Sequence, residues 1–240
     1  MTRGNRAARA RAAGAVCAAA ASLALLGACS GGSGAASSTP DGAERTERAA
    51  RAADDPSPSR SRELSEDQRE RKDLVSATEV GWEKAARTAE KKVSGSTLVE
   101  IELGDGDDGG GDGDDGDGGG GKVTPVWEAE VATEDGTSHD IRVDAVSGKV
   151  TRAEKDDGQD ADDRKKTADR LAQAKVTPVK AAAAAAGHQK GTVTGVSLDD
   201  ADGGPTVWAV DIVSRGTWAK TTFDVDAGNG RVLHEHVDRD

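Results

Sequence analysis

Two stretches decide how this chain of 240 residues folds: TPVWEAEV at 124–131 and PTVWAVDI at 205–212. Each stretch alternates apolar and polar residues around a tryptophan, which is typical of a half-buried antiparallel strand. A second pair of segments follows in the same order, VDAVSGKV at 143–150 and VDAGNGRV at 225–232. Because both order and spacing recur, the chain contains an internal repeat.

Each repeat is interpreted as one helix followed by antiparallel strands. In the first repeat, Ser76 and Glu79 have the spacing of a capping box, and apolar residues then recur at helical spacing at Trp82, Ala85, Ala86, Ala89 and Val93. In the second repeat, Thr177 is the expected N-cap and Pro178 the first helical residue. We therefore expect an α+β fold of two small domains, each with one helix packed on a three- to four-stranded antiparallel sheet.

The main difference between the repeats is the Gly/Asp tract GDGDDGGGDGDDGDGGGG at 104–121. It follows a predicted strand at 97–103 and takes the place of DDADGGP at 199–205 in the second repeat. We interpret it as an expanded loop within the first domain, because the cost of closing a loop grows only with the logarithm of its length. Clustered aspartates are also typical calcium ligands, but their spacing does not fit an EF-hand, which favours a solvated loop.

The N-terminus has the pattern of a lipoprotein signal. Arginines without any acidic residue precede a short apolar run at 15–29, which ends in Leu26-Gly27-Ala28-Cys29. The run is too short for a membrane-spanning helix, which needs roughly 20 apolar residues. We expect residues 1–28 to be removed and Cys29 to be lipidated. The alternative is an ordinary cleaved signal in which Cys29 has no role.

The remaining boundaries follow from composition. Residues 29–64 are rich in Gly, Ser, Pro and alternating charge, which predicts a disordered tether. The two domains are expected at 65–155 and 176–240, joined by a connector at 156–175 that is either flexible or partly helical. Together with Cys29, this order predicts a protein anchored by lipid to the extracytoplasmic face of the cell membrane.

The net charge of the chain indicates which classes of partner it can bind. Removing residues 1–28 takes four of the 32 basic residues and none of the 44 acidic ones, which leaves a net charge of −16. Nucleic acids and anionic lipids need a basic face, so neither is an expected partner. An acidic chain favours basic partners or cations.

The alanine-rich helix, the tryptophan strands, the acidic hairpin and the VDAxxGxV segments together resemble the PepSY domain, present twice at about 75–150 and 176–237. The VDAxxG element maps to Val143, Asp144, Ala145 and Gly148, and to Val225, Asp226, Ala227 and Gly230. The resemblance implies a relation to propeptides of thermolysin-like metalloproteases and to cell-envelope proteins that inhibit or regulate peptidases. No peptidase domain follows in this sequence, so we expect action on a separate protein.

Few side chains suggest chemistry. His234 and His236 would share one side of a strand with Asp238, as in a transition-metal site, but two imidazoles without fixed further ligands favour a polar strand end. Asp144 and Asp226 are candidates for acid/base catalysis, although an aspartate before a glycine turn more often accepts backbone N–H groups. No catalytic Ser/His/Asp or Cys/His arrangement is recognisable. We therefore expect neither a metal, nor a cofactor, nor an enzyme.

The tryptophans differ in their expected roles. Trp127 and Trp208 are interpreted as core anchors. Trp218 is aligned with Ser138 and follows SRGT at 214–217, where the glycine is expected to form the turn. We expect Trp218 to be exposed there and to contact a partner protein.

Three functions compete, in decreasing order of preference. The first is a lipoprotein that binds another envelope protein, with a peptidase as the expected partner. The second is a cation-binding protein of the cell surface, and the third is an enzyme whose site the sequence does not reveal.

Overall fold

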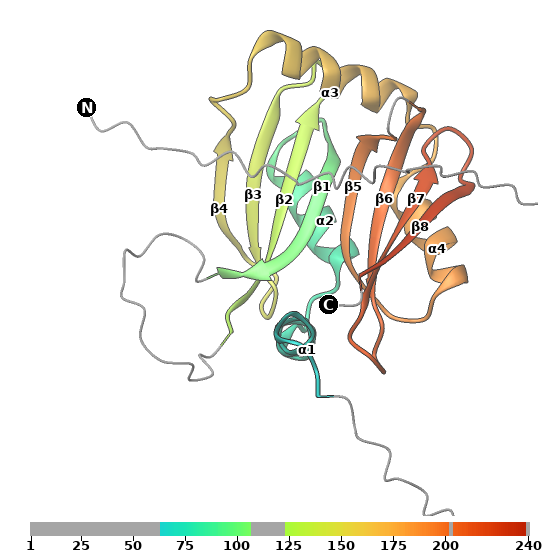
Figure 1. Ribbon diagram of the computed structural model, residues 1–240. Coiled ribbons are helices and arrows are strands. Elements are labelled where there is room, and N and C mark those ends of the chain that lie inside the picture. Colours follow the sequence, from blue (N-terminus) through green and yellow to red (C-terminus); the bar gives the residue numbers. More distant parts are fainter. Residues whose placement is uncertain (1–62, 107–122, 202–203, 239–240) are drawn as a thin grey trace, which may run out of the picture. The chain divides into compact units, whose positions relative to one another are not determined.

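The computed structural model describes residues 63–106, 123–201 and 204–238, which belong to one compact unit, Pro58–Asp240 (Figure 1). The predicted signal peptide, Cys29 and nearly all of the predicted tether lie outside the described residues. The elements in chain order are α1 (Glu66–Ala77), α2 (Trp82–Lys92), β1 (Ser96–Asp105), β2 (Pro125–Thr133), β3 (Ser138–Asp144), β4 (Val150–Lys155), α3 (Ala161–Gln173), α4 (Pro178–His188), β5 (Thr192–Asp200), β6 (Thr206–Val213), β7 (Lys220–Asp226) and β8 (Val232–Asp238).

All of these strands form a single antiparallel sheet in the order β4-β3-β2-β1-β5-β6-β7-β8. Each repeat contributes a meander of four strands and one helix packed on it, which confirms the predicted α+β class and the helix-plus-strands unit. The structure adds a feature that the sequence did not reveal. The two four-stranded sheets join edge to edge, so the second repeat continues the sheet of the first.

The junction is short, and its central pair of side chains is buried. Strands β1 and β5 pair over three positions: Glu100↔Ser197, Ile101↔Val196 and Glu102↔Gly195. Ile101 and Val196 are at most 1% exposed. A sheet edge presents unpaired backbone N–H and C=O groups, so this pairing covers one edge of each repeat. Strands β4 and β8 remain as the two outer strands.

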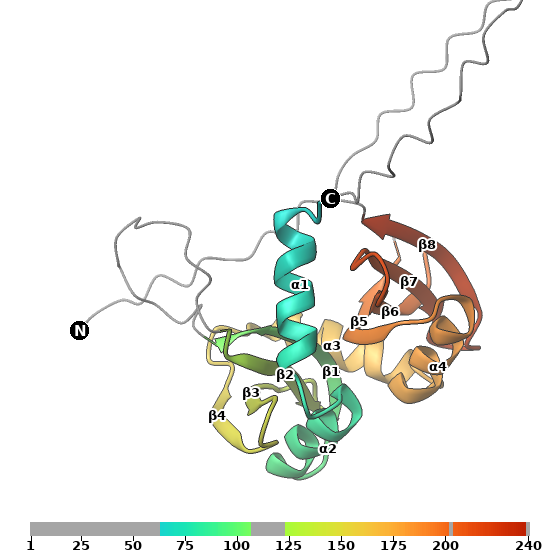
Figure 2. The same ribbon diagram turned by 90° about the horizontal axis from the view of Figure 1, so that it is seen from below.

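Helices α2 and α4 cover the same face of the sheet, as both views show (Figures 1 and 2). Their buried residues are small except for Trp82, which lets each helix lie close to the strands: Ala85, Ala86 and Ala89 in α2, and Ala181, Ala182 and Ala185 in α4. Thr177 is the N-cap of α4 and accepts a hydrogen bond from the Lys180 N–H, as predicted. The apolar helix face therefore joins the inward residues of both repeats in one core.

Helix α1 was not predicted from the sequence. It begins with a capping box in which Ser65 Oγ accepts from the Gln68 N–H at 3.2 Å and Gln68 Oε1 accepts from the Ser65 N–H at 3.1 Å. Ser76 lies inside α1, and α2 begins after Gly81, so the predicted capping box at Ser76 and Glu79 is wrong. Glu79 lies between the two helices, where its N–H donates to the carbonyl of Ala145 in the turn after β3.

Helix α3 lies in the segment that was predicted as a connector, flexible or partly helical. Asp160 caps it, accepting hydrogen bonds from the N–H groups of Asp162 and Asp163. Gln159 Nε2 then binds the carbonyl oxygen of Gly136 and the hydroxyl of Ser138, both at 2.9 Å. Thus α3, which precedes the second repeat, packs on the β2–β3 hairpin of the first.

The Gly/Asp tract joins two paired strands. Strands β1 and β2 pair as far as Asp105↔Pro125, and the Thr124 N–H donates to Asp105 Oδ1 at 2.9 Å. Gly104 and Asp105 belong to β1, while residues 107–121 lie outside the described residues. The strands on either side of the tract therefore form a hairpin, paired as far as Asp105 and Pro125.

Candidate functional site

The repeated tryptophans hold the helices on the sheet. The indole N–H of Trp127 donates to the carbonyl of Val80 at 2.7 Å, and that of Trp208 donates to the carbonyl of Val176 at 2.8 Å. Both tryptophans are 1% exposed. The acceptor residues lie just before α2 and α4, so the interpretation of these tryptophans as core anchors is confirmed.

The aspartates of the VDA segments fix turns. Asp144 Oδ1 accepts hydrogen bonds from the N–H groups of Val146 at 3.2 Å and Ser147 at 2.6 Å, and Asp226 Oδ1 binds two backbone N–H groups of its own turn. The bond from the Ser147 backbone is the main reason that the pKa of Asp144 lies below its ordinary value. The structural interpretation of both aspartates is confirmed.

The alanine of each VDA segment completes this arrangement. The carbonyl of Ala145 accepts from the N–H groups of Glu79 at 3.0 Å and Val80 at 2.8 Å, and the carbonyl of Ala227 binds the corresponding pair before α4. Val80 therefore receives one bond at its carbonyl and donates another from its N–H. The residues of the repeated motif fix the start of each helix against the sheet.

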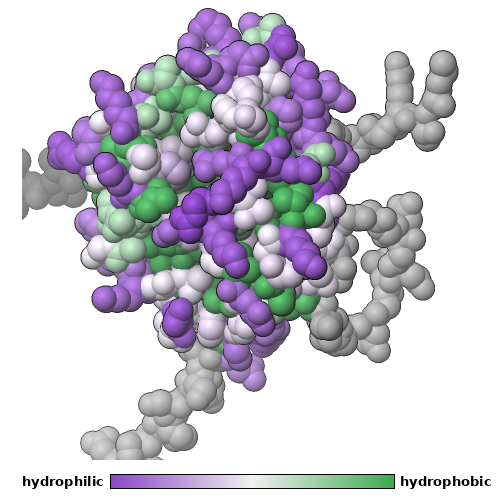
Figure 3. Space-filling model, turned by 180° about the vertical axis from the view of Figure 1, so that it is seen from behind, coloured by the Kyte–Doolittle hydropathy of each residue, from purple (hydrophilic) through white to green (hydrophobic). Residues whose placement is uncertain are grey.

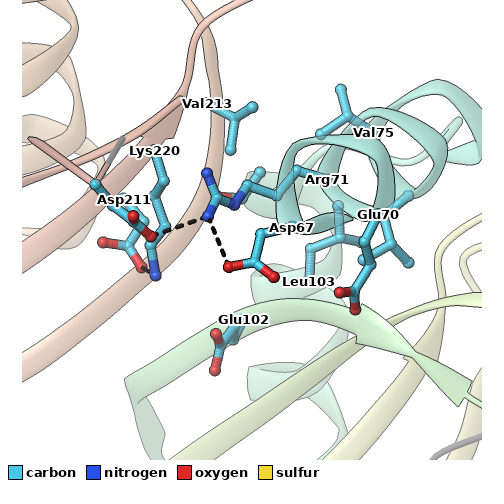
Figure 4. Close-up of a pocket in the computed structure, with 12 residues that line it drawn as sticks. Asp67, Glu70, Arg71, Val75, Glu102, Leu103, Asp211, Val213 and Lys220 are labelled. Carbon is cyan, nitrogen blue, oxygen red and sulfur yellow. Dashed lines mark hydrogen bonds and ion pairs between the residues drawn. The ribbon is translucent and has the colours of Figure 1, made fainter. Parts of the chain in front are cut away.

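A pocket of about 280 Å³ lies where the two repeats meet. Its walls come from α1 and β1 of the first repeat and from β5 to β8 of the second. Arg71 of α1 extends into it, with a side chain only 15% exposed (Figure 4). One guanidinium nitrogen binds Asp238 Oδ2 at 2.9 Å, and the other donates to the carbonyl of Trp218 at 3.2 Å. The pocket therefore depends on both repeats.

The pocket combines an apolar wall with an excess of carboxylates. The apolar side chains are Leu74, Val75, Leu103 and Val213. The acidic side chains are Asp67, Glu70, Glu102, Asp211 and Asp238. The basic side chains of the lining are Arg71 and Lys220. Arg71 pairs with Asp238 at 2.9 Å, and Lys220 pairs with Asp211 at 3.8 Å. The lining thus has a formal charge of −3.

Trp218 lies in the loop between β6 and β7 and is half-buried rather than exposed. Its backbone carbonyl binds the pocket residue Arg71, although Trp218 itself does not line the pocket. After the loop, strand pairing resumes at Ser138 in the first repeat and at Lys220 in the second, so these two residues are equivalent. Trp218 lies two positions before Lys220 and therefore corresponds to Gly136. The expected equivalence with Ser138 is wrong, because the extra residue of the second repeat lies within this loop. Gly216 does not adopt the left-handed conformation of the turn. Trp218 does, with φ of 59°.

Of the predicted metal candidate, Asp238 lines the pocket and pairs with Arg71, but the two histidines are not among the lining residues. His234 and His236 are exposed on β8. In the described part of the chain, no three His, Cys, Asp or Glu side chains are placed to hold a metal ion. Cys29 and residues 107–121 of the Gly/Asp tract lie outside that part. Lipidation, and cation binding by the tract, therefore stay predictions.

A row of carboxylates crosses the first repeat. The pairing of neighbouring strands from β1 to β4 brings four carboxylates side by side: Glu100, Glu130, Asp140 and Glu154. Burial raises the pKa of Glu130, a hydrogen bond with Ser138 opposes this shift, and the charges of Glu100, Asp140 and Asp156 add to it. The next row begins with Glu102, which also lines the pocket, so the acidic row and the pocket are neighbours.

The helix-covered side has a mixed surface, on which Figure 3 shows hydrophobic patches interrupted by hydrophilic side chains. Among the described residues, the exposed large hydrophobic side chains are Val146 and Val179.

The helices of the described segments include none that is both long and apolar enough to cross a membrane.

Sequence reasoning missed the pocket residues Arg71 and Lys220. The S-x-x-Q spacing of Ser65 and Gln68 was a usable signal for α1. No sequence pattern, however, indicated that β1 would pair with β5 and bring α1 against the second repeat.

A family model matches both repeats of the chain. The family model described as "PepSY: Peptidase propeptide and YPEB domain" matches residues 83–154 and 175–236. A crystal structure from Clostridium difficile 630, described as a "putative lipoprotein", is 20% identical, with a TM-score of 0.39, 67% of this chain covered and 95% of that one. The YpmB protein from Bacillus subtilis is 15% identical, with a TM-score of 0.26 and coverages of 65% and 98%. No curated protein gave a significant match. Because the two family matches together span more than half of the sequence, the chain belongs to the PepSY family.

Proposed function

We propose that this chain is a non-catalytic envelope lipoprotein whose tandem PepSY domains bind another protein and thereby regulate or inhibit a peptidase. The observation that carries the proposal is the pair of family matches, at 83–154 and 175–236, because the family is described by its peptidase propeptides. A propeptide acts by contact with its peptidase, so a binding role follows without any chemistry in the domain itself.

The use of the motif residues supports this proposal. In both repeats, the tryptophan and the aspartate and alanine of the VDA segment hold the helix start or a turn. Their hydrogen-bonding groups are engaged in building the fold. In the described part of the chain, the surface features open to a partner include the pocket, the loop of Trp218 and the outer strands.

The proposed location is the membrane surface. Lipidated Cys29 would anchor the chain at the extracytoplasmic face, and residues 29–64 would act as a flexible tether. A flexible chain of about 36 residues has a root-mean-square span of about 30–36 Å. Such a tether keeps the domains near the membrane at a high effective concentration relative to other anchored proteins.

The proposed mode of binding uses the outer strands together with Trp218. Strands β4 and β8 are the ends of the strand order, and β4 is exposed at five of its six positions. An outer strand accepts an extended partner segment by backbone hydrogen bonding. Trp218, at the loop beside the pocket, would add an aromatic contact.

The test is affinity capture of the tagged full chain from solubilised envelopes, with the captured proteins identified by mass spectrometry. We expect recovery of a peptidase whose hydrolysis of a peptide substrate changes when the purified chain is added. Trp218→Ala should weaken capture at least several-fold. Val179→Ala is the matched control, because it removes another apolar side chain that is 43% exposed, on α4.

Two results would count against the proposal. Capture of no specific protein, together with sub-millimolar binding of calcium or zinc by the purified chain, would favour a cation-binding function instead. Equal capture by wild type, Trp218→Ala and Val179→Ala would leave protein binding in place but remove Trp218 from the contact.

A further inference from the structure

We propose that the pocket at the junction of the repeats binds the side chain of a lysine or arginine presented by an extended segment of a partner protein. This inference rests on the proposed protein-binding function and assigns to it a site and a ligand chemistry. Three properties of the pocket carry it: its size, its lining and its charge.

The size suits one side chain. Pockets for drug-sized ligands and cofactors have volumes of about 300–1,000 Å³. At about 280 Å³, this pocket lies at the lower limit of that range. Its size therefore suits a single long side chain.

The lining suits a side chain with an apolar stem and a charged head. Leu74, Val75 and Leu103 provide an aliphatic wall, against which the methylene groups of lysine or arginine would lie. Glu70 of α1 and Glu102 of β1 lie near that wall and would face the cationic head (Figure 4). An uncharged aliphatic residue would match only the wall.

The charge favours a cation over an anion. Five carboxylates line the pocket against Arg71 and Lys220, and each of these two cations is engaged in an ion pair with a pocket carboxylate. The acidic row on β1 to β4 begins next to Glu102 and carries further carboxylates, of which Glu154 is paired with Arg152. Such a surface would attract a basic segment and disfavour an acidic one.

The experiment uses the full chain in detergent, labelled for NMR, and two acetylated and amidated seven-residue peptides. They are identical except for a central lysine or a central norleucine, which has the same stem without the charge. We expect the lysine peptide to shift the amide signals of Arg71, Glu102 and Lys220, and 0.5 M salt to weaken its binding. The norleucine peptide should bind at least about fivefold more weakly.

The variant Glu70→Gln/Glu102→Gln should weaken binding of the lysine peptide about five- to tenfold, since partly exposed charge pairs contribute modestly. The matched control is Glu134→Gln/Asp157→Asn, which removes two exposed carboxylates outside the pocket and should leave the affinity unchanged. Equal binding of the two peptides, signal shifts confined to other surfaces, or equal losses in both double variants would overturn the inference.

A parallel capture experiment separates this inference from the proposed function. A partner recovered equally by wild type and by Glu70→Gln/Glu102→Gln overturns the pocket site and keeps protein binding. Specific binding of the lysine peptide with no protein captured keeps the site and contradicts the function. Displacement of the lysine peptide by sub-millimolar calcium chloride overturns the inference in favour of an inorganic cation site.

Discussion

The indole N–H of Trp127 donates a 2.7 Å hydrogen bond to the carbonyl of Val80, and both residues are almost completely buried, at 1% and 4% exposed. The bond connects the second strand of the repeat to the residue that precedes its helix. The same bond recurs between Trp208 and Val176. One side chain per repeat thus fixes where the helix meets the sheet.

Trp127→Phe should lower the free energy of unfolding by about 1–3 kcal/mol, because the buried carbonyl of Val80 loses its donor. Urea denaturation followed by circular dichroism measures the loss. Trp218→Phe is the control, since the half-buried Trp218 keeps its backbone conformation and should change stability by no more than about 0.5 kcal/mol. Equal losses in the two variants would show that the buried bond is not the cause.

Gly136→Ala should destabilise the protein strongly. Gly136 has φ of +80°, and an added Cβ would lie 1.9 Å from the carbonyl oxygen of Arg164 in α3. The left-handed conformation alone costs a residue with a Cβ about 1–2 kcal/mol, and α3 must also shift. Thermal unfolding should show a clear decrease in Tm.

Gly216→Ala serves as the control for that prediction. Gly216 lies in the corresponding loop of the second repeat, where an added Cβ meets nothing within 4 Å. Replacement of a glycine without strain changes stability by about 0.4–1 kcal/mol in the favourable direction. A similar loss of stability in both variants would contradict the close contact of α3 with Gly136.

The repeated units could be predicted because their signals are local. Alternation around Trp127 and Trp208, the cap at Thr177 and the glycine turn after Asp144 each depend on residues close in sequence. Helix α1 was not predicted, because its segment is strongly charged and buries a single residue, Leu74. Periodicity of apolar residues cannot detect such a helix, although its capping box can.

The pocket could not be predicted, because it depends on contacts between segments far apart in the chain. Arg71 and Asp238 are separated by 167 positions. They meet because β1 pairs with β5 over three positions, and no composition or periodicity specifies which edges of two small sheets will pair. The position of Trp218 was misaligned for a smaller reason, the placement of one extra residue within a loop.

Glu130 should make stability fall as the pH rises. Its pKa is raised, mainly by burial, so the folded state binds protons more tightly than the unfolded state. The charged form of Glu130 therefore destabilises the fold. This loss of stability begins as the pH rises past the ordinary glutamate pKa, and it is complete above the raised pKa of the folded state. Glu130→Gln should therefore be more stable than wild type at pH 7, and the difference should shrink as the pH falls toward 4.

Asp144→Asn provides the opposite case. Hydrogen bonds from the turn, first from the Ser147 backbone, lower the pKa of Asp144, so its charge stabilises the fold above the ordinary aspartate value. That contribution is lost as the pH falls through the lowered pKa. The variant should be less stable than wild type at pH 7 and approach it in acid. Urea titrations at several pH values test both signs, and parallel pH profiles of the two variants would contradict these assignments.

Shortening the Gly/Asp tract should leave the first repeat folded. Residues 107–121 can be replaced by DDADGG, after the shorter loop of the second repeat, while Gly104 and Asp105 stay because they belong to β1. Each halving of a flexible loop lowers its closure cost by about 0.6 kcal/mol. We expect unchanged cooperativity in urea and a slightly higher midpoint. Loss of the cooperative transition would show that the tract has a structural role.

Cys29→Ala should abolish membrane attachment. Lipidation at this position supplies the predicted anchor, and stable attachment takes more than one acyl chain, because a single chain gives only marginal, reversible binding. Without the thiol, the chain should appear in the soluble extracytoplasmic fraction or remain unprocessed, as detected by fractionation and immunoblotting. Cys17→Ala is the matched control, since Cys17 lies within the apolar run that is expected to be removed. Full membrane retention of the processed Cys29→Ala chain would contradict the lipid anchor, and with it the proposal that the tandem domains search for their partner from a membrane tether.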